Sequence, residues 1–249
     1  IVTKALTGAT SLISNSQNSS NILINEWGID SDKVTVLNPG VDTKRFSPAE
    51  YSLQERKHLG WNNRPVIITV SRLEERKGHD CLIKALPEVK KIVPDVLYVI
   101  IGDGPELKTL ENLSQQLNVN ENVIFMSEID DKEMIKCYQQ CDVFVLPNRT
   151  INNNIEGFGM VLVEAQSCGK PVIGGNSGGT PETMIINESG FVVDCSTSSK
   201  PLAEKLITLL SDTSLREKMG KVGREHVVKT LDWTPHVASA KLIFQQLKL

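Results

Sequence analysis

From Pro65 onward, two hydrophobic patterns alternate along the chain. Short, nearly continuous apolar runs predict strands at VIITV (66–70), VLYVIIG (96–102), NVIFMS (122–127), CDVFVLP (141–147), PVIGGN (171–176) and FVVD (191–194). Between them, apolar residues with helical spacing predict helices over 78–93, 105–118, 132–140 and 159–168. Valine- and isoleucine-rich strands that alternate with helices are typical of a buried parallel sheet. The predicted fold class is therefore α/β, a Rossmann-like parallel sheet with helices on both faces.

The pattern differs at the two ends of the chain. Residues 9–16 and 33–38 read as strands and residues 17–27 as a helix, before Asn38-Pro39-Gly40 interrupts the pattern. Residues 39–63 are polar, with a short helical piece at 52–59, and we interpret them as a connector. The sheet unit then spans 64–232, with helices predicted from Pro201 to Leu210 and over 214–229. A last helix begins at Trp233 and runs to Leu247.

Composition narrows the classes of protein. The 249 residues are 40% hydrophobic and 23% charged, with a formal net charge of −3, so non-specific nucleic-acid binding is not expected to be the main activity. No apolar run reaches the roughly 18 residues of a membrane span, and no signal segment opens the chain, which favours a cytoplasmic protein. Five cysteines without a C-x-x-C pair and four dispersed histidines predict reduced thiols and no zinc site. Because the chain starts at Ile1, we interpret it as cut from a longer protein.

The segment EGFGMVLVE (156–164) carries the clearest chemistry. Gly157 and Gly159 allow a bound group to approach the backbone closely. The N–H groups of Phe158, Gly159 and Met160 open a helix between two parallel strands, which favours an anion such as phosphate.

Glu164 lies inside the apolar helix that follows. A carboxylate in such a position needs partners, and two neighbouring ribose hydroxyls would supply paired donors. The alternative is a salt-bridged or capping glutamate with a purely structural role.

The loop SRLEERKG (71–78) follows the first strand of the sheet. Arg72 at the strand end and Lys77 at the predicted helix start would hold a diphosphate, since a cation in a first helical turn needs an anion to offset the helix dipole. The alternative is a solvated charge run paired with Glu74 and Glu75.

Other loops at the carboxyl ends of the strands converge on the same rim. The turn GDGPE brings the backbone at Gly102 close to the crevice, and NSGGTPE does the same at Gly178 and Gly179. The Asn-rich loop NRTINNNIEGFG (148–159) is expected to be mobile when empty.

Together these motifs resemble the nucleotide-sugar-dependent retaining glycosyltransferases of the GT-B fold (group 1, family 4 type), which include phosphatidylinositol mannosyltransferases, sucrose synthases and lipopolysaccharide glucosyltransferases. The resemblance rests on NPGVD, SRLEERKGHD, GDGPE, EGFGMVLVE and GGTPE in the family's order and approximate spacing, and on the E-x7-E element in particular. The PNRTINNNIEGFG loop is most similar to the mannosyltransferase branch.

The resemblance implies a role for each motif. Arg72 and Lys77 would hold the donor's diphosphate and stabilise its charge as it leaves, Glu164 would bind the ribose, and Glu156 would hold the sugar and act with Arg72 and Lys77 in catalysis. The donor-binding set implied by the resemblance also contains Gly102, Gly157, Phe158, Gly159, Met160 and Gly179. It implies attack from the face that the nucleotide leaves, with no metal and no other cofactor.

The resemblance also implies a domain organisation. Residues 1–38 would be the last strand and helix of an N-terminal acceptor domain, which would hold a carbohydrate or lipid-linked acceptor and a catalytic His that this chain lacks. Residues 64–232 would be the nucleotide-sugar domain, and 233–249 a helix that returns to the first domain. No nucleic-acid partner is implied, and the full-length protein would make peripheral contact with the inner face of a membrane.

Three other readings stay open from the sequence. An NAD(P)-dependent dehydrogenase would carry G-x-G-x-x-G where this chain has SRLEERKG. A nucleotide-sugar epimerase of the same fold is disfavoured by the E-x7-E element. A nucleotide-binding module with no activity of its own describes the isolated chain equally well.

Overall fold

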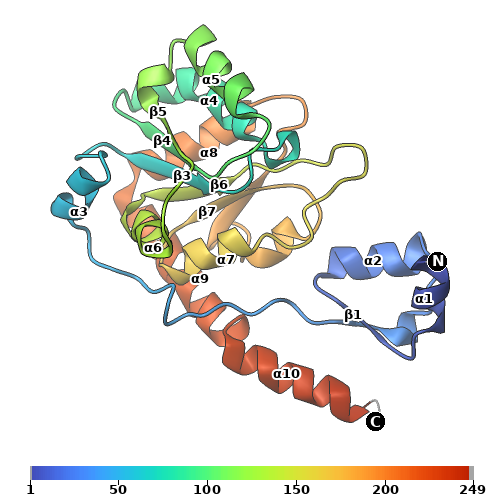
Figure 1. Cartoon of the computed structure of the whole chain (residues 1–249). Coiled ribbons are helices and arrows are strands. Elements are labelled where there is room, and N and C mark those ends of the chain that lie inside the picture. The colour runs from blue at the N-terminus through green and yellow to red at the C-terminus, as the bar shows by residue number, and fades with distance from the viewer. Residues whose placement is uncertain (1, 247–249) are drawn as a thin grey trace.

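A six-stranded parallel sheet forms the centre of the protein, in a computed structural model that describes residues 2–246 (Figure 1). The strand order is β5-β4-β3-β6-β7-β8, and every neighbouring pair is parallel. The strands are β3 (Val66–Val70), β4 (Leu97–Ile101), β5 (Val123–Met126), β6 (Val143–Leu146), β7 (Val172–Gly175) and β8 (Gly190–Val193). The predicted α/β class with a Rossmann-like parallel sheet is confirmed.

Helices cover both faces of this sheet, as the continuous apolar strands predict. Ile67 packs into a core with α4, α5 and α8, whereas the next residue, Ile68, packs into a second core with α6 and α7. The covering helices are α4 (His79–Ile92), α5 (Leu107–Gln116), α6 (Asp131–Gln140), α7 (Met160–Ser167), α8 (Lys200–Ser211) and α9 (Thr213–Thr230). Each lies within a few residues of its predicted bounds.

Residues 2–38 form a small separate layer. Strands β1 (Leu12–Ser14) and β2 (Val34–Val36) pair in parallel, with α2 (Gln17–Asn25) between them. The strand predicted over 9–16 is correct only for 12–14, and the helix α1 (Val2–Gly8) was missed. Figure 1 shows this layer beside α7, away from α4 and α5.

The connector passes the start of the last helix. It contains α3 (Leu53–His58), and short 3-10 turns occur elsewhere in the chain at η1 (Ser31–Lys33), η2 (Glu75–Lys77), η3 (Asn120–Asn122) and η4 (Thr180–Thr183). Val41 N–H donates to the Leu231 carbonyl at 2.8 Å, so the connector lies beside the end of α9.

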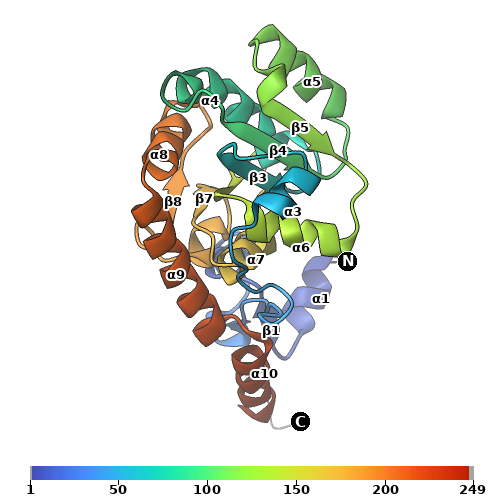
Figure 2. The same cartoon turned by 90° about the vertical axis from the view of Figure 1, so that its left-hand side faces the viewer.

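Helix α10 (Trp233–Gln246) leads away from the sheet in both views (Figures 1 and 2). On this helix the apolar side chains of Val237 and Leu242 are 45% and 61% exposed. Leu247, the predicted last residue of the helix, lies outside the described residues. Within residues 2–246, no helix combines the length and apolarity that crossing a membrane requires. The domain boundaries at 38, 63 and 232 stay predictions.

Candidate functional site

The candidate site lies where the strand order reverses. The chain moves outward from β3 through β4 to β5, then returns to the other side of β3 with β6 and continues to β7 and β8. Loops after β3 and β6 therefore diverge at this point and leave a crevice at the carboxyl ends of the strands, where ligands of such sheets bind.

Lys77 and Glu156, both singled out by the sequence, are brought together here. The Lys77 ammonium pairs directly with Glu156 Oε2, and Arg76 Nη1 lies 3.1 Å from the same oxygen. The three side chains are only 12%, 14% and 20% exposed, for Lys77, Glu156 and Arg76. The chain's own carboxylate thus neutralises the basic group expected to hold a diphosphate.

Arg72 lies apart from this cluster. Its side chain is 76% exposed, and its Nη1 lies 3.1 Å from Glu74 Oε1. The charge-run alternative thus describes Arg72, which pairs with Glu74, whereas Lys77 pairs with Glu156 from another loop. Lys77 also precedes α4 by two residues, in the 3-10 turn η2, so it does not occupy the predicted first helical turn.

Arg76 was missed by sequence reasoning. The only signal was its place beside Lys77 in a run of charged residues, and such a run does not tell which side chain turns inward. In addition to its pair with Glu156, Arg76 places its Nε 3.1 Å from Glu74 Oε2, so this arginine links two carboxylates of the rim.

Glu164 has a hydrogen-bond partner inside the protein. The Tyr138 hydroxyl, buried on α6, donates to Glu164 Oε2 at 2.7 Å. Burial raises the pKa of Glu164, and the Tyr138 hydrogen bond and the charge of Arg45 oppose the rise. Within the described part of the chain, Oε1 accepts no hydrogen bond, so this oxygen remains available to a ligand hydroxyl.

The glycines of the site allow its loops to pack against one another. Gly102 has φ +135°, and a Cβ there would lie 2.1 Å from the Ser71 carbonyl oxygen. Gly178 has φ +57°, and a Cβ there would lie 1.9 Å from the Glu156 carbonyl oxygen. Close approach is therefore needed by the chain itself, while a role for these loops in donor binding stays a prediction.

The start of α7 combines a buried anchor with an open backbone. Phe158 is 3% exposed and belongs to the core under the sheet, and Met160 packs against the same core. Gly159 caps α7 in the left-handed region at φ 101°, without a side-chain hydrogen bond. Since both side chains point into the protein, the backbone N–H groups are what this turn offers to an anion.

His79 belongs to the packing beneath the site and is 2% exposed. Its Nε2 lies 2.9 Å from Ser71 Oγ, and its Nδ1 lies 2.9 Å from the hydroxyl of Tyr98, which donates to Thr69 Oγ1 at 3.0 Å. Burial lowers the pKa of His79 to about 4. A neutral imidazole thus ties the end of β3 to β4, behind the loop that carries Arg72 and Lys77.

The Asn-rich loop is held at its base. Arg149 Nη1 lies 2.7 Å from Asp80 Oδ1, and its backbone N–H donates to the Arg76 carbonyl at 2.8 Å. At the tip, Asn152 and Asn153 adopt positive φ angles of 48° and 62°, so the loop ends in a tight turn. Its mobility in the empty state stays a prediction.

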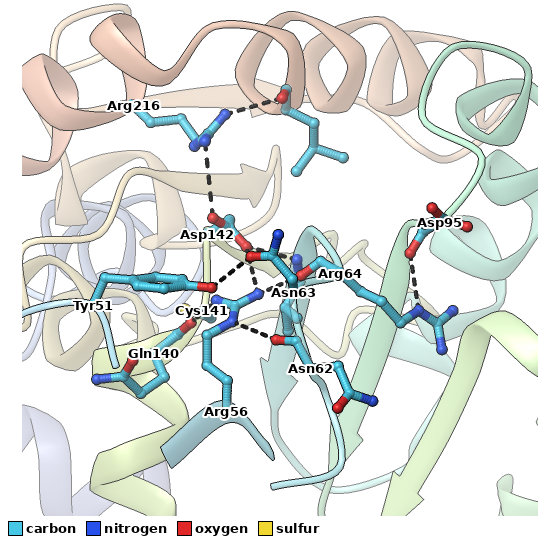
Figure 3. Close-up of polar contacts among 12 residues, drawn as sticks. Tyr51, Arg56, Asn62, Asn63, Arg64, Asp95, Gln140, Cys141, Asp142 and Arg216 are labelled. Atoms are coloured by element: carbon cyan, nitrogen blue, oxygen red, sulfur yellow. Dashed lines mark hydrogen bonds and ion pairs between the residues drawn. The ribbon is translucent and has the colours of Figure 1, made fainter. Parts of the chain in front are cut away.

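A pocket of about 450 Å³ lies at the opposite, amino-terminal end of the sheet and has a structural network in its wall (Figure 3). Arg56, which is 2% exposed, donates to the carbonyls of Asn62, Gln140 and Arg64 and pairs with Asp142 at 3.3 Å. With its donors committed to the protein, this arginine holds the connector to the sheet. Within residues 2–246, no three His, Cys, Asp or Glu side chains are grouped to hold a metal ion.

Comparisons with known proteins agree with this geometry. The family described as glycosyl transferases group 1 matches residues 52–226. The GDP-mannose-dependent alpha-(1-6)-phosphatidylinositol monomannoside mannosyltransferase of Mycolicibacterium smegmatis is 41% identical over 202 residues, which are 79% of this chain and 52% of that protein. The chain thus spans about half the length of this relative.

Two solved structures resemble the fold over much of the chain. Anabaena HepE in complex with UDP has a TM-score of 0.84 at 26% identity, covering 98% of this chain and 65% of HepE. The C-terminal domain of the group 1 family protein LpcC from Francisella tularensis has a TM-score of 0.68 at 30% identity, covering 78% of this chain and all (100%) of that domain. The match to the group 1 family spans the whole sheet and its rim loops, and the chain belongs to the glycosyl transferases group 1 family.

Proposed function

We propose that this chain is the donor-binding part of a glycosyltransferase that moves a hexosyl group from a nucleoside diphosphate sugar to a carbohydrate or lipid acceptor. The observation that carries the proposal is the convergence of Lys77, Arg76 and Glu156 at the switch point of a parallel sheet. Glu164 lies further along the same E-x7-E element, with one carboxylate oxygen unused. Such a rim offers cations for phosphate and carboxylates for sugar hydroxyls.

In this proposal, the diphosphate binds to Lys77, Arg76 and the exposed Arg72, which swings in from the rim. These cations stabilise the charge that develops on the departing phosphate. Glu164 accepts the ribose hydroxyls, and Glu156 accepts a hydroxyl of the transferred sugar. The reaction proceeds with retention of the anomeric configuration and without a metal.

The donor that we favour is GDP-mannose. The Mycolicibacterium relative is named as dependent on that nucleotide sugar and is 41% identical, whereas the UDP-bound HepE is 26% identical. That relative is also named for a phosphatidylinositol monomannoside acceptor, which supports a lipid-linked acceptor and a location at the periphery of the cytoplasmic membrane face.

We further propose that residues 64–232 form the donor domain, and that 1–38 with 233–249 belong to the acceptor side. The match to an LpcC C-terminal domain, solved as a separate domain, supports this division. The exposed apolar residues of α10 fit a helix that packs against further protein.

The proposal is tested by calorimetric titration of the purified chain with GDP, UDP and ADP. We expect GDP to bind most tightly, with a dissociation constant between roughly micromolar and millimolar, because an open half-cleft buries little of the ligand. Absence of heat with all three nucleotides at saturating concentration contradicts the proposal.

We also expect the 249-residue chain to transfer no sugar by itself. Transfer requires the acceptor hydroxyl to be held against the anomeric carbon with water excluded, and such positioning supplies several kcal/mol of the barrier. Sustained transfer from GDP-mannose by the chain alone, above the level of a Lys77→Ala preparation, would refute this expectation.

A further inference from the structure

The first structural layer is fastened to the rim by Glu182, the last residue of the GGTPE motif. The backbone N–H groups of Gln17 and Asn18 donate to its two carboxylate oxygens at 2.6 and 2.9 Å. These N–H groups open α2 and lie 165 and 164 positions away along the chain. An anion at a helix N-terminus is favoured both by hydrogen bonding and by the helix dipole.

The turn that precedes α2 packs closely against two glycines, Gly157 and Gly179. A Cβ on Gly179 would lie 2.8 Å from Ser16 Cβ, and a Cβ on Gly157 would lie 3.0 Å from Asn15 Nδ2. A side chain at Gly179 would force the turn away from the rim. The same glycine-bearing loops that line the proposed donor site therefore also hold the first layer, which lies beside α7 in Figure 1.

Within this turn, the Asn15 amide has a fixed orientation. The Ser19 hydroxyl donates to Asn15 Oδ1 at 2.8 Å, and the backbone carbonyl of Asn15 accepts from Asn38 Nδ2 at 3.1 Å. With the oxygen held by Ser19, the amide N–H₂ group faces Gly157, the neighbour of Glu156. The Asn15 side chain is exposed, so a ligand in the crevice can reach it.

We propose that Glu182 is a positioning residue that clamps α2 to the rim, and that Asn15 thereby donates a hydrogen bond to the transferred sugar. The second half rests on the proposed function. The Asn15 amide and the Glu156 carboxylate form a complementary pair, because one donates to a hydroxyl oxygen and the other accepts a hydroxyl proton. Recognition of the sugar is thus shared between the first layer and the sheet, whereas the nucleotide is bound by the sheet alone.

The clamp itself is tested by hydrogen exchange of the peptide that contains Gln17 and Asn18, with no ligand present. In Glu182→Ala, the exchange of the α2 amides is expected to rise about five- to tenfold, since they lose their acceptor, and Glu182→Gln is expected to lie between it and the wild type. Glu188→Gln, an exposed change on the same segment, is the matched control and is expected to leave exchange unchanged. Equal exchange in Glu182→Ala and the wild type overturns the clamp.

Sugar recognition is tested by titrating GDP and GDP-mannose into the wild type, Glu182→Ala and Asn15→Ala. Both variants are expected to bind GDP within about twofold of the wild type, which also confirms that they fold. They are expected to bind GDP-mannose about three- to tenfold more weakly. The double variant is expected to be no weaker than Glu182→Ala, because the clamp acts through Asn15. Asn25→Ala, at the far end of α2, is the matched control.

The outcomes separate the two proposals. If the wild type binds GDP but the variants lose no GDP-mannose affinity, the role of Asn15 is overturned while the proposed function stands. If the wild type binds no nucleotide, the proposed function fails together with the role of Asn15, and the exchange experiment alone decides the clamp.

Discussion

Glu156→Gln is predicted to tighten the binding of a bare nucleoside diphosphate. Glu156 Oε2 accepts hydrogen bonds from the Lys77 ammonium and, at 3.1 Å, from Arg76 Nη1. A diphosphate must displace this carboxylate from the two cations or share them with it. The neutral amide of Gln keeps the shape and removes the competing charge.

The magnitude follows from the burial of the three groups. Their side chains are 12–20% exposed, so the pairs are neither fully screened nor fully dry. Hydrogen bonds between charged groups in such settings contribute about 1.5–3 kcal/mol, and part of this is offset by restored solvation. We expect a net gain of about 1–2 kcal/mol, a five- to thirtyfold tighter complex with GDP.

In Glu156→Gln, the preference of the protein for GDP-mannose over GDP is predicted to decrease. The released Glu156 carboxylate would accept a sugar hydroxyl, and Gln loses most of that bond, so the extra affinity of GDP-mannose over GDP falls by about 1.5–3 kcal/mol. Lys77→Ala, by contrast, weakens both ligands by about 1.5–3 kcal/mol.

Calorimetry with both ligands at one ionic strength measures these effects. Lys91→Ala is the control for removal of a lysine, since that side chain is 67% exposed and pairs with Glu88 on the same helix. If Glu156→Gln weakens GDP as much as Lys77→Ala does, Glu156 does not compete with the phosphate and the reasoning is refuted.

Four further predictions concern pH and stability. Burial lowers the pKa of His79 from 6.5 to about 4, so the stability that the neutral imidazole contributes is complete above pH 6.5 and is lost as the pH falls toward 4. In urea titrations, His79→Gln is expected to remove about 3 kcal/mol of this loss of stability in acid, and an unchanged pH profile would contradict the prediction. Burial raises the pKa of Glu164, so its carboxylate takes up a proton at a higher pH than an ordinary glutamate, and nucleotide affinity is expected to decrease as the pH is lowered through that range. Glu164→Gln is expected to bind nucleotide weakly and without this pH dependence, and pH profiles of the same shape for the variant and the wild type would reject the ribose role. A strained backbone conformation costs about 1–3 kcal/mol, and Gly102→Ala is expected to destabilise the protein by more than this because its Cβ would also lie 2.1 Å from the Ser71 carbonyl oxygen. Gly60→Ala, also at positive φ but with open space around it, is the control and is expected to destabilise the protein less. Arg56→Met is expected to cost about 3–5 kcal/mol in the same assay while leaving GDP affinity unchanged, since Arg56 lines the pocket at the amino-terminal end of the strands; reduced affinity in the folded protein would contradict this.

The sheet could be predicted from the sequence because its information is local. Strands such as β4, whose side chains are all buried, must be apolar on both faces, and the intervening helices repeat their apolar residues with a different period. The short helix α1 was missed because its seven residues, VTKALTG, are too few to establish a helical apolar period.

The candidate site could be predicted only in part. Lys77, Glu156 and Glu164 stand in recognisable motifs, but which charged groups meet is set by tertiary structure. Nothing local indicated that Arg76 turns inward or that Tyr138 on α6 contacts Glu164. Glu182 belongs to the GGTPE motif, but the sequence did not indicate its contact with Gln17 at the start of α2, which lies 165 residues away along the chain.

In the proposed function, the rim couples phosphate binding to sugar binding. Lys77 and Arg76 pair with Glu156, which a diphosphate would replace. The displaced carboxylate would then lie beside Gly157, close to the amide nitrogen of Asn15. Displacement of Glu156 from its ion pairs is unfavourable, and a ligand with phosphates but no sugar gains no contact from the released carboxylate. A nucleotide sugar offers that carboxylate a hydroxyl, and the new hydrogen bond offsets part of the unfavourable free energy. Discrimination between nucleotide and nucleotide sugar is thus expected to depend on Glu156 more than on any cation of the rim.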